Sequence, residues 1–382
     1  MKFTKTAIAV AAVVGSVTAV AQTANVTLYG RVSTNIESVT YKAPGISVRN
    51  NTVENVSSRF GFRGSESLGG GMNAIFQLES GFASDTGANG VSGGVQQLFS
   101  REAWVGLNGG FGEVKVGYGL TPYDDVLGWA HHQGANSWEN RNNGVSGGAG
   151  FAKRDLFTNY VNSTGCTSSA FDARYGNSIS YKSPTIAGGL TVRTQYALIG
   201  EASTNSCNAW DTAVLYNAGP LRVGVTYAMH KRFTGLGGTS LATADKPTFD
   251  QDALRGYASF DFGPALIDAT YETARYKLAT QLKYKYWEIG VLAPLGAWTL
   301  GAQYSQRDNG LAYAYSAATQ ALSVTAAGLT TANWANGGGK HIALTADYAL
   351  SKRTAIRSYY AQLKNETGVK INAISTGLWH SF

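Results

Sequence analysis

The sequence predicts an all-β fold, a transmembrane antiparallel β-barrel of sixteen strands that occupies residues 22–382. Three observations predict it: segments of about ten residues that alternate apolar with polar side chains, short turns that alternate with long loops, and an export leader without a helical anchor. In a barrel of this kind the apolar face of each segment points outward. A soluble β-sandwich would bury that face instead.

Residues 1–21 have the three parts of a secretory signal peptide. Lys2 and Lys5 are followed by the apolar run 7–15 and by the small residues of Ala19-Val20-Ala21, so cleavage is expected after Ala21. The apolar run is too short to span a bilayer, and no later stretch of eighteen uncharged apolar residues occurs. We therefore expect an exported protein without a transmembrane helix.

The composition favours one large β-unit. Hydrophobic residues make up 44% of the chain, and 47 Gly and 21 Tyr accompany only 7 Pro. Charged residues make up 14% of the chain, well below the roughly 25% of soluble domains. No Pro-rich or Ser-rich linker divides the sequence, so a second domain is not expected.

Alternation within the segments predicts which side chains face outward, because successive side chains of a strand point to opposite sides. In Arg59-Phe-Gly-Phe-Arg63 both Phe point one way and both Arg the other. The last segment, 369–382, places alternate residues on one face and ends on an aromatic residue within the strand. Such an ending is expected where a sheet closes on itself.

Turns and loops alternate strictly along the chain. Short Gly- or Pro-containing turns are expected near residues 68–71, 108–112, 186–189, 218–220, 263–264, 294–296 and 350–353. Longer loops are expected between them, including 41–55, 84–96 and, by far the longest, 120–175. Outer-membrane barrels have short periplasmic turns and long external loops, so an even strand count places both chain ends in the periplasm.

Four blocks of the sequence resemble one family. They are Val26-Thr-Leu-Tyr-Gly30, the block from Ser58 to Ala74, Phe99-Ser-Arg-Glu-Ala-Trp-Val-Gly-Leu107 and the ending Gly377-Leu-Trp-His-Ser-Phe382. Together they resemble Gram-negative trimeric general porins of the beta-proteobacterial type. The resemblance implies a homotrimer in the outer membrane, surrounded by lipid and lipopolysaccharide, whose third loop folds into the lumen. It also implies recognition by the barrel-assembly machinery, for which the expected C-terminal signal is Leu378, His380 and Phe382.

The segment 120–175 is unusual by length alone, since loops beyond about 12 to 15 residues normally have a function. A barrel of sixteen strands has an aqueous interior that could accept it, and the loop would narrow the channel there. Its expected acidic residues are Asp124, Asp125 and Glu139. The family's usual loop tip, Pro-Glu-Phe-Gly, is absent. The basic residues expected on the opposite wall are Arg31, Arg59, Arg63, Arg101, Lys115 and Arg193.

Opposite charges across a constriction would orient dipolar solutes and set ion preference. The predicted function is therefore passive diffusion of small hydrophilic solutes and inorganic ions, with no enzymatic step and no cofactor. The formal charge of +7 includes Lys2 and Lys5, so the mature chain carries about +5 and a mild anion preference is expected. The alternatives are a substrate-selective channel of the same family and a structural or adhesive barrel.

The remaining motifs are weaker indications of structure or function. Cys166 and Cys207 are the only cysteines, and an even count in an exported protein favours a disulfide between them over two loop thiols. His131 and His132 are adjacent, but two neighbouring histidines do not make a metal site, so no metal is expected. Basic residues are scattered along the strands rather than clustered, which argues against a nucleic-acid partner.

Overall fold

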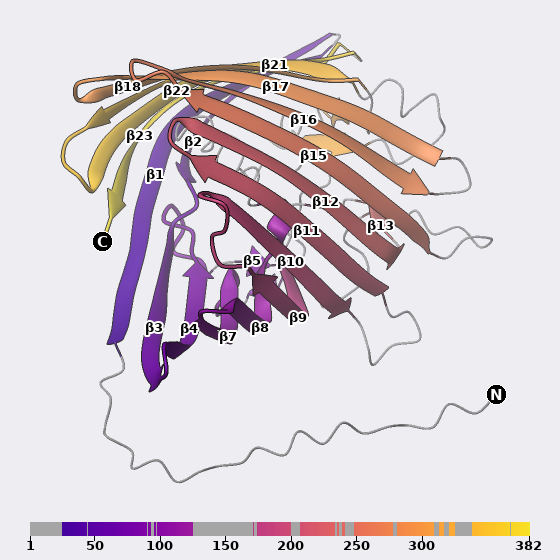
Figure 1. Ribbon diagram of the computed structural model, residues 1–382. Coiled ribbons are helices and arrows are strands. Elements are labelled where there is room, and N and C mark those ends of the chain that lie inside the picture. Colours follow the sequence, from indigo (N-terminus) through magenta and orange to yellow (C-terminus); the bar gives the residue numbers. More distant parts are fainter. Residues whose placement is uncertain are drawn as a thin grey trace.

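The computed structural model describes residues 25–43, 45–89, 91–92, 95–96, 98–124, 171, 174–199, 207–233, 235–236, 239–240, 248–277, 281–308, 313–316, 321–324, 338–366 and 368–382. Within these ranges the chain is almost entirely β-strand (Figure 1). Among the described residues, no helix has the length and hydropathy needed to span a membrane.

Seventeen strands form one sheet. They are β1 (Asn25–Ala43), β2 (Ile46–Asn55), β3 (Arg59–Gly69), β4 (Met72–Gly81), β7 (Glu102–Gly109), β8 (Gly112–Leu120), β9 (Arg174–Lys182), β10 (Leu190–Ile199), β11 (Cys207–Ala218), β12 (Leu221–Phe233), β15 (Phe249–Asp261), β16 (Leu266–Lys277), β17 (Gln281–Leu295), β18 (Trp298–Arg307), β21 (Gly339–Ala349), β22 (Thr354–Asn365) and β23 (Lys370–Ser381). Three small hairpins lie outside it: β5 (Val91–Ser92) with β6 (Val95–Gln96), β13 (Gly235–Leu236) with β14 (Thr239–Ser240), and β19 (Tyr313–Ser316) with β20 (Ala321–Val324).

The sheet closes into a barrel where the two ends of the chain meet. One edge of β1 pairs with β23, and its other edge pairs first with β3 and then with β2. Because β2 and β3 share one place beside β1, the seventeen strands fill sixteen places, all antiparallel. The backbones of Gly30 and Phe382 exchange hydrogen bonds of 3.1 and 3.0 Å at the end of this seam. The predicted fold class is confirmed, with the terminal aromatic residue at the closure.

The prediction of one external loop is wrong. The range 41–55 was expected to be an external loop, but β1 and β2 pair continuously from Ala43↔Ile46 to Thr34↔Asn55. The chain reverses in a tight turn at Gly45, whose φ of 75° lies in the left-handed region that glycine adopts without strain. Val39 and Tyr41 alternate with polar residues here, so the alternation that predicts strands continues into the range assigned to the loop.

The exposed large apolar side chains of the strands face outward, as the alternation predicts, and the inner face carries polar and charged side chains together with a cluster of buried aromatic and aliphatic ones. On β1, Ile36 is 67% exposed and its neighbour Glu37 is 2% exposed. On β17, Trp287 and Ile289 face outward on either side of the buried Glu288. An apolar outer surface around a charged interior is the arrangement that a hydrocarbon environment requires of a barrel with an aqueous lumen.

The barrel has two kinds of wall. The strands β3, β4, β7, β8 and β9, here called the short wall, have 8 to 11 residues each. The strands β11, β12, β15, β16 and β17, here called the long wall, have 12 to 15 residues each. Figure 1 shows the difference in height, with the short wall at the lower left and the long strands crossing the upper part. The barrel therefore has a low side and a high side.

Candidate functional site: the inner face of the barrel

The six basic residues expected on the wall all lie on the inner face or contact it. Arg31 is on β1, Arg59 and Arg63 are on β3, Lys115 is on β8 and Arg193 is on β10. Arg101 directly precedes β7 and reaches the inward-facing Glu79 of β4. Arg101 excepted, each of them alternates along its strand with residues of the opposite, apolar face.

Arg31, Arg59 and Arg101, here called the basic cluster, gather around Glu79. Arg101 Nε donates to Glu79 Oε1 at 2.5 Å, and Arg59 Nε lies 4.0 Å from Glu79 Oε2. Arg31 Nε donates to the carbonyl oxygen of Ser57 at 2.9 Å, within electrostatic reach of the other two arginines and of the glutamate. Among the described residues, Arg59 and Arg101 share one carboxylate, Glu79, and no carboxylate lies within ion-pair distance of Arg31. The result is a local excess of positive charge beside the lumen.

The positive region continues along the wall. The guanidinium of Arg63 lies 5.1 Å from the Tyr29 ring centroid, and this side chain is exposed. Lys115 Nζ lies 2.7 Å from Glu113 Oε1 and 4.1 Å from the Trp104 ring centroid. These contacts fix the direction of each side chain while leaving its charge at the inner surface.

Arg174 was missed by the sequence analysis. Its Nε lies 3.8 Å from Glu102 Oε1, and Arg193 Nη2 donates to the carbonyl oxygen of Leu120 at 2.7 Å close by. The expected loop extended to residue 175, so Arg174 was counted as loop although β9 begins there. The alternation that starts at this residue was the available signal.

Trp379 was also missed as an inner-face residue. It lies on β23 between β1 and β22, and each of these strands contributes one arginine to it. The guanidinium carbon of Arg31 lies 4.0 Å from the ring centroid and that of Arg357 lies 3.5 Å from it. Arg357 Nε is also 3.2 Å from Asp347 Oδ2. Both cations therefore contact the same indole ring, and a cation over an aromatic face is attracted by the ring quadrupole.

Both described ends of the third loop lie against the inner face of the long wall. Arg255 of β15 donates from Nη1 to the carbonyl oxygen of Tyr123 at 3.1 Å, and its guanidinium lies 4.1 Å from the Tyr123 ring centroid. At the far end of the loop, the Phe171 ring lies 5.0 Å from His230 of β12. Thr121 Oγ1 donates to the carbonyl oxygen of Phe171 at 3.1 Å, which joins the two ends.

Of the acidic residues expected on this loop, Asp124 lies at its start, where its backbone N–H donates to the carbonyl oxygen of Thr121 at 3.1 Å. Asp125 and Glu139 lie outside the described residues. Cys207 is buried at the start of β11 and is disulfide-bonded. Its expected partner Cys166 lies outside the described residues, so the pairing with Cys166 stays a prediction. In the described part of the chain, no group of three His, Cys, Asp or Glu could hold a metal ion.

The three residues of the expected assembly signal lie on the outer face of β23. Leu378 and Phe382 are exposed, and His380 Nδ1 is 2.9 Å from Thr354 Oγ1 of β22. They belong to the seam strand that pairs with both β22 and β1. Their role in assembly stays a prediction, since position alone does not test recognition.

A closed antiparallel barrel with an apolar outer face and a charged inner face defines a membrane channel of the outer-membrane type. The sequence profile of the Gram-negative porin family matches residues 6–368, and the chain belongs to this family. It is therefore an outer-membrane porin, which forms a water-filled channel for passive diffusion of small solutes.

Individual relatives agree with this assignment. The chain is 31% identical to "Outer membrane porin protein 32" of Delftia acidovorans over 300 residues, which cover 76% of each chain. The solved "Anion-selective porin from Comamonas acidovorans" has a TM-score of 0.67 at 24% identity and covers 94% of this chain and 100% of its own. A trimer form of OmpT from Vibrio cholerae has a TM-score of 0.59 at 14% identity, with coverages of 94% and 99%.

Proposed function

We propose that this porin prefers anions and that the basic cluster sets the preference. The observation that carries the proposal is that Arg59 and Arg101 share one carboxylate, Glu79, on the inner face, while Arg31 beside them donates to the carbonyl oxygen of Ser57. Fixed charges beside a narrow aqueous path raise the local concentration of counter-ions, so chloride is favoured over potassium near this cluster. The similarity in fold to a porin named as anion-selective supports the same preference.

Single-channel recording in a planar bilayer under a KCl gradient tests the proposal. The zero-current potential of the wild type should lie toward the chloride value, and Arg59→Gln should move it toward the potassium value. The matched control is Lys285→Gln, which removes a cation from the outer face of β17 and should leave the potential unchanged. A wild-type potential at zero or toward the potassium value would contradict the proposal.

We further propose that the third loop, 120–175, folds into the lumen and narrows it, with Asp124, Asp125 and Glu139 opposite the basic cluster. The contacts of Tyr123 and Phe171 with the inner face of the long wall support this direction of the loop. Deletion of residues 128–165 should increase the single-channel conductance at least severalfold. An unchanged conductance would place the narrowest point elsewhere.

A homotrimer is the assembly we propose, with the short wall as the contact between subunits. The outward side chains of β4, β7 and β8 carry no charge and include Phe76, Val105 and Val116. Ala103→Trp on β7 should then block trimer formation, whereas Ala269→Trp on the outer face of β16 should not. Semi-native gel electrophoresis without heating measures the trimer. Equal trimer yields for the two variants would move the contact off the short wall.

The remaining expectations are proposals of the same kind. We infer that cleavage follows Ala21, that the barrel-assembly machinery recognises the terminal residues 378–382, and that lipopolysaccharide surrounds the outer rim. Diffusion through the channel makes and breaks no bond, so we assign no catalytic role to the inner-face residues. N-terminal sequencing of the purified protein tests the first of these, and a mature chain that begins elsewhere than at residue 22 would contradict it.

A further inference from the structure

The alternation of β9 is interrupted near its first residues. In the regular part of the strand, Ser178 and Ser180 are buried on the inner face, and Ile179 between them is 57% exposed. Counting back by twos from Ile179 would place Tyr175 on the outer face as well. Tyr175 is instead fully buried. The strand therefore turns this side chain toward the interior against its own period.

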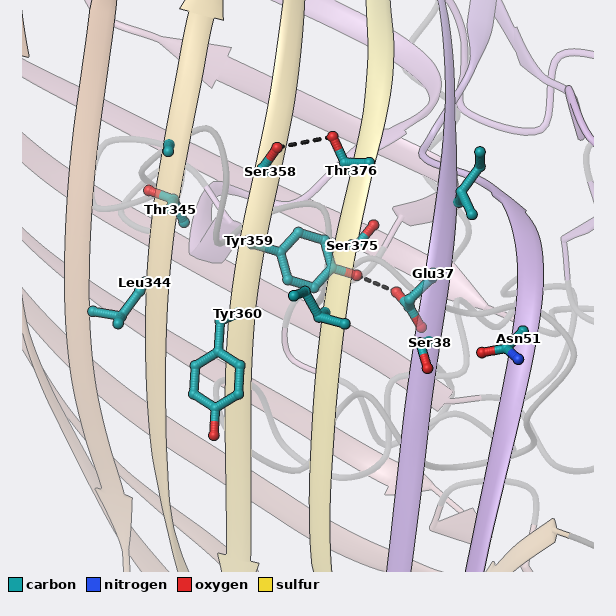
Figure 2. A pocket seen from close by; sticks show the side chains of 13 residues that line it. Glu37, Ser38, Asn51, Leu344, Thr345, Ser358, Tyr359, Tyr360, Ser375 and Thr376 are labelled. Atoms are coloured by element: carbon teal, nitrogen blue, oxygen red, sulfur yellow. Dashed lines mark hydrogen bonds between the residues drawn. The ribbon is translucent and has the colours of Figure 1, made fainter.

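A regular strand of the same barrel behaves differently. On β22 the neighbouring residues Tyr359 and Tyr360 lie on opposite faces, with 4% and 37% of their surface exposed. Figure 2 shows Tyr359 directed toward Glu37 of β1, to which its hydroxyl donates, while Tyr360 points away from Glu37. On β9 the neighbours Arg174 and Tyr175 are both buried. The difference lies in the backbone of β9.

The backbone of β9 contains a β-bulge. The register pairs Gly117 of β8 with Ser178 and Gly119 with Tyr175. Two steps along β8 therefore match three steps along β9, which is the pattern of a bulge. Asn177, within the longer stretch, has a φ of 49°, in the left-handed region that Asn tolerates better than most residues. Gly117 has a φ of 139°, and a Cβ there would lie 2.4 Å from a carbonyl oxygen of β7, so this position requires glycine.

One side-chain hydroxyl holds the bulge in place. Ser178 Oγ donates to the carbonyl oxygen of Gly117 at 2.8 Å and lies 3.2 Å from the carbonyl oxygen of Tyr175. Gln195 Nε2 of β10 donates to the same Oγ at 2.9 Å. Ser178 is 4% exposed and Gln195 is 2% exposed, so water competes little for these hydrogen bonds. We call Ser178 and Gln195 the bulge lock, which joins β8, β9 and β10.

The bulge directs Tyr175 at the residue that anchors the third loop. The rings of Tyr175 and His230 meet edge to face with their centroids 5.5 Å apart, and the Tyr175 hydroxyl lies 3.4 Å from His230 Nδ1. The same imidazole packs against Phe171 at the far end of the loop and stacks on Phe233 with a centroid distance of 5.3 Å. The start of β9 and the far end of the loop therefore meet on one histidine.

We propose that the bulge lock positions the third loop: acting through Tyr175, it holds the far end of the loop on the inner face and so limits the conductance of the channel. The inference rests on the proposed inward fold of this loop. Barrel closure does not need the bulge, because β8 and β9 pair regularly from Gly117↔Ser178 to Glu113↔Lys182. The two buried polar residues of the lock therefore serve the path of the loop rather than the sheet.

Single-channel recording of the purified protein in a planar bilayer tests the proposal. Ser178→Ala removes the shared hydroxyl and should raise the conductance by about 1.5- to 2-fold, with more frequent fluctuations of the open channel, because the loop end is no longer fixed. Gln195→Leu should act in the same direction, whereas Ser178→Thr keeps a hydroxyl and should keep the wild-type conductance. The matched control is Ser180→Ala, on the same face of β9 two residues away. Equal conductance for Ser178→Ala and Ser180→Ala would overturn the proposal.

Two further measurements separate the role of the lock from that of the loop and from a purely structural role. In the variant that lacks residues 128–165, Ser178→Ala should change the conductance no further, because no loop is left to position. If that deletion raises the conductance but Ser178→Ala in the full chain does not, the loop narrows the channel and the proposed role of the lock is wrong. If neither change raises the conductance, the inward fold of the loop is wrong as well. Semi-native gels measure the folded barrel, and a loss of folded Ser178→Ala protein with wild-type conductance in the remaining channels would also overturn the proposal.

Discussion

The inward basic residues of the short wall and of the long wall differ in how they are paired. On the long wall, the buried Arg255 pairs with Glu272, and His230 Nε2 lies 3.3 Å from Asp211 Oδ1. At the short wall, Arg59 and Arg101 share Glu79, and Arg31 of the adjoining β1 donates to the carbonyl oxygen of Ser57. Paired charges stabilise the packing of the loop ends, whereas unmatched charges contribute a field to the lumen. The comparison separates the residues that hold the barrel interior together from those that act on ions.

The largest effect is expected from Arg255→Ala on the long wall. Arg255 is 1% exposed, pairs with Glu272 and holds the carbonyl oxygen of Tyr123. Its loss leaves a buried carboxylate without its partner, which should lower the free energy of unfolding by about 3 kcal/mol. Urea unfolding followed by tryptophan fluorescence measures the change. The control is Arg63→Ala, which should cost less than about 0.5 kcal/mol because Arg63 is exposed. Equal losses of unfolding free energy in Arg255→Ala and Arg63→Ala would remove the distinction between the two walls.

A smaller loss of stability is expected where the barrel closes. A Cβ added at Gly377 of β23 would lie 2.3 Å from the carbonyl oxygen of Thr34 and 2.0 Å from Asn35 Oδ1. Gly377→Ala should therefore cost about 1 to 3 kcal/mol and reduce the yield of heat-modifiable, folded barrel. Gly256→Ala on the long wall is the matched control, since nothing lies within 4 Å of its added Cβ. A fully folded Gly377→Ala protein of wild-type stability would show that β1 and β23 can separate enough to accept the added Cβ.

A change in selectivity with little change in stability is expected from Glu79→Gln. The substitution removes the carboxylate that the basic cluster shares, so the ratio of chloride to potassium permeability should rise by about two- to threefold. Arg59→Gln should change it in the opposite direction. Reversal potentials under a KCl gradient measure both, with Glu66→Gln near the β3–β4 turn as a control. Changes of the same sign for Glu79→Gln and Arg59→Gln would be incompatible with a field set by this cluster.

The smallest effect is expected at the seam, from Trp379→Leu. Arg31 and Arg357 both contact this ring, so its loss removes the attraction that holds two like charges close together. The permeability ratio should fall by about twofold, and Trp379→Phe should restore most of it because the aromatic face remains. Trp287→Leu on the outer face of β17 controls for the loss of a tryptophan. A loss of folding in Trp379→Leu without a change in selectivity would leave the ring a purely structural role.

Sequence reasoning predicted the faces of the strands well and the connections less well. The inward arginines of β1 and β3 were found because alternation is a local property of each strand. The β1–β2 hairpin was assigned to a loop because the range 41–55 is rich in polar residues and its apolar ones are few. Arg174 was missed for the related reason that the boundary of a long loop is poorly marked in a single sequence.

By itself, the sequence determined the closed barrel, the apolar outer face, the inward direction of the basic residues and the placement of the chain end at the seam. These follow from a side-chain period of two and from the need to satisfy every backbone group in a membrane. Only the tertiary structure decided which residues meet. Asn35 and Ser375, 340 positions apart, share a hydrogen bond of 2.9 Å across the seam between β1 and β23. Register between strands depends on pairing across the whole sheet, and no local pattern specifies it.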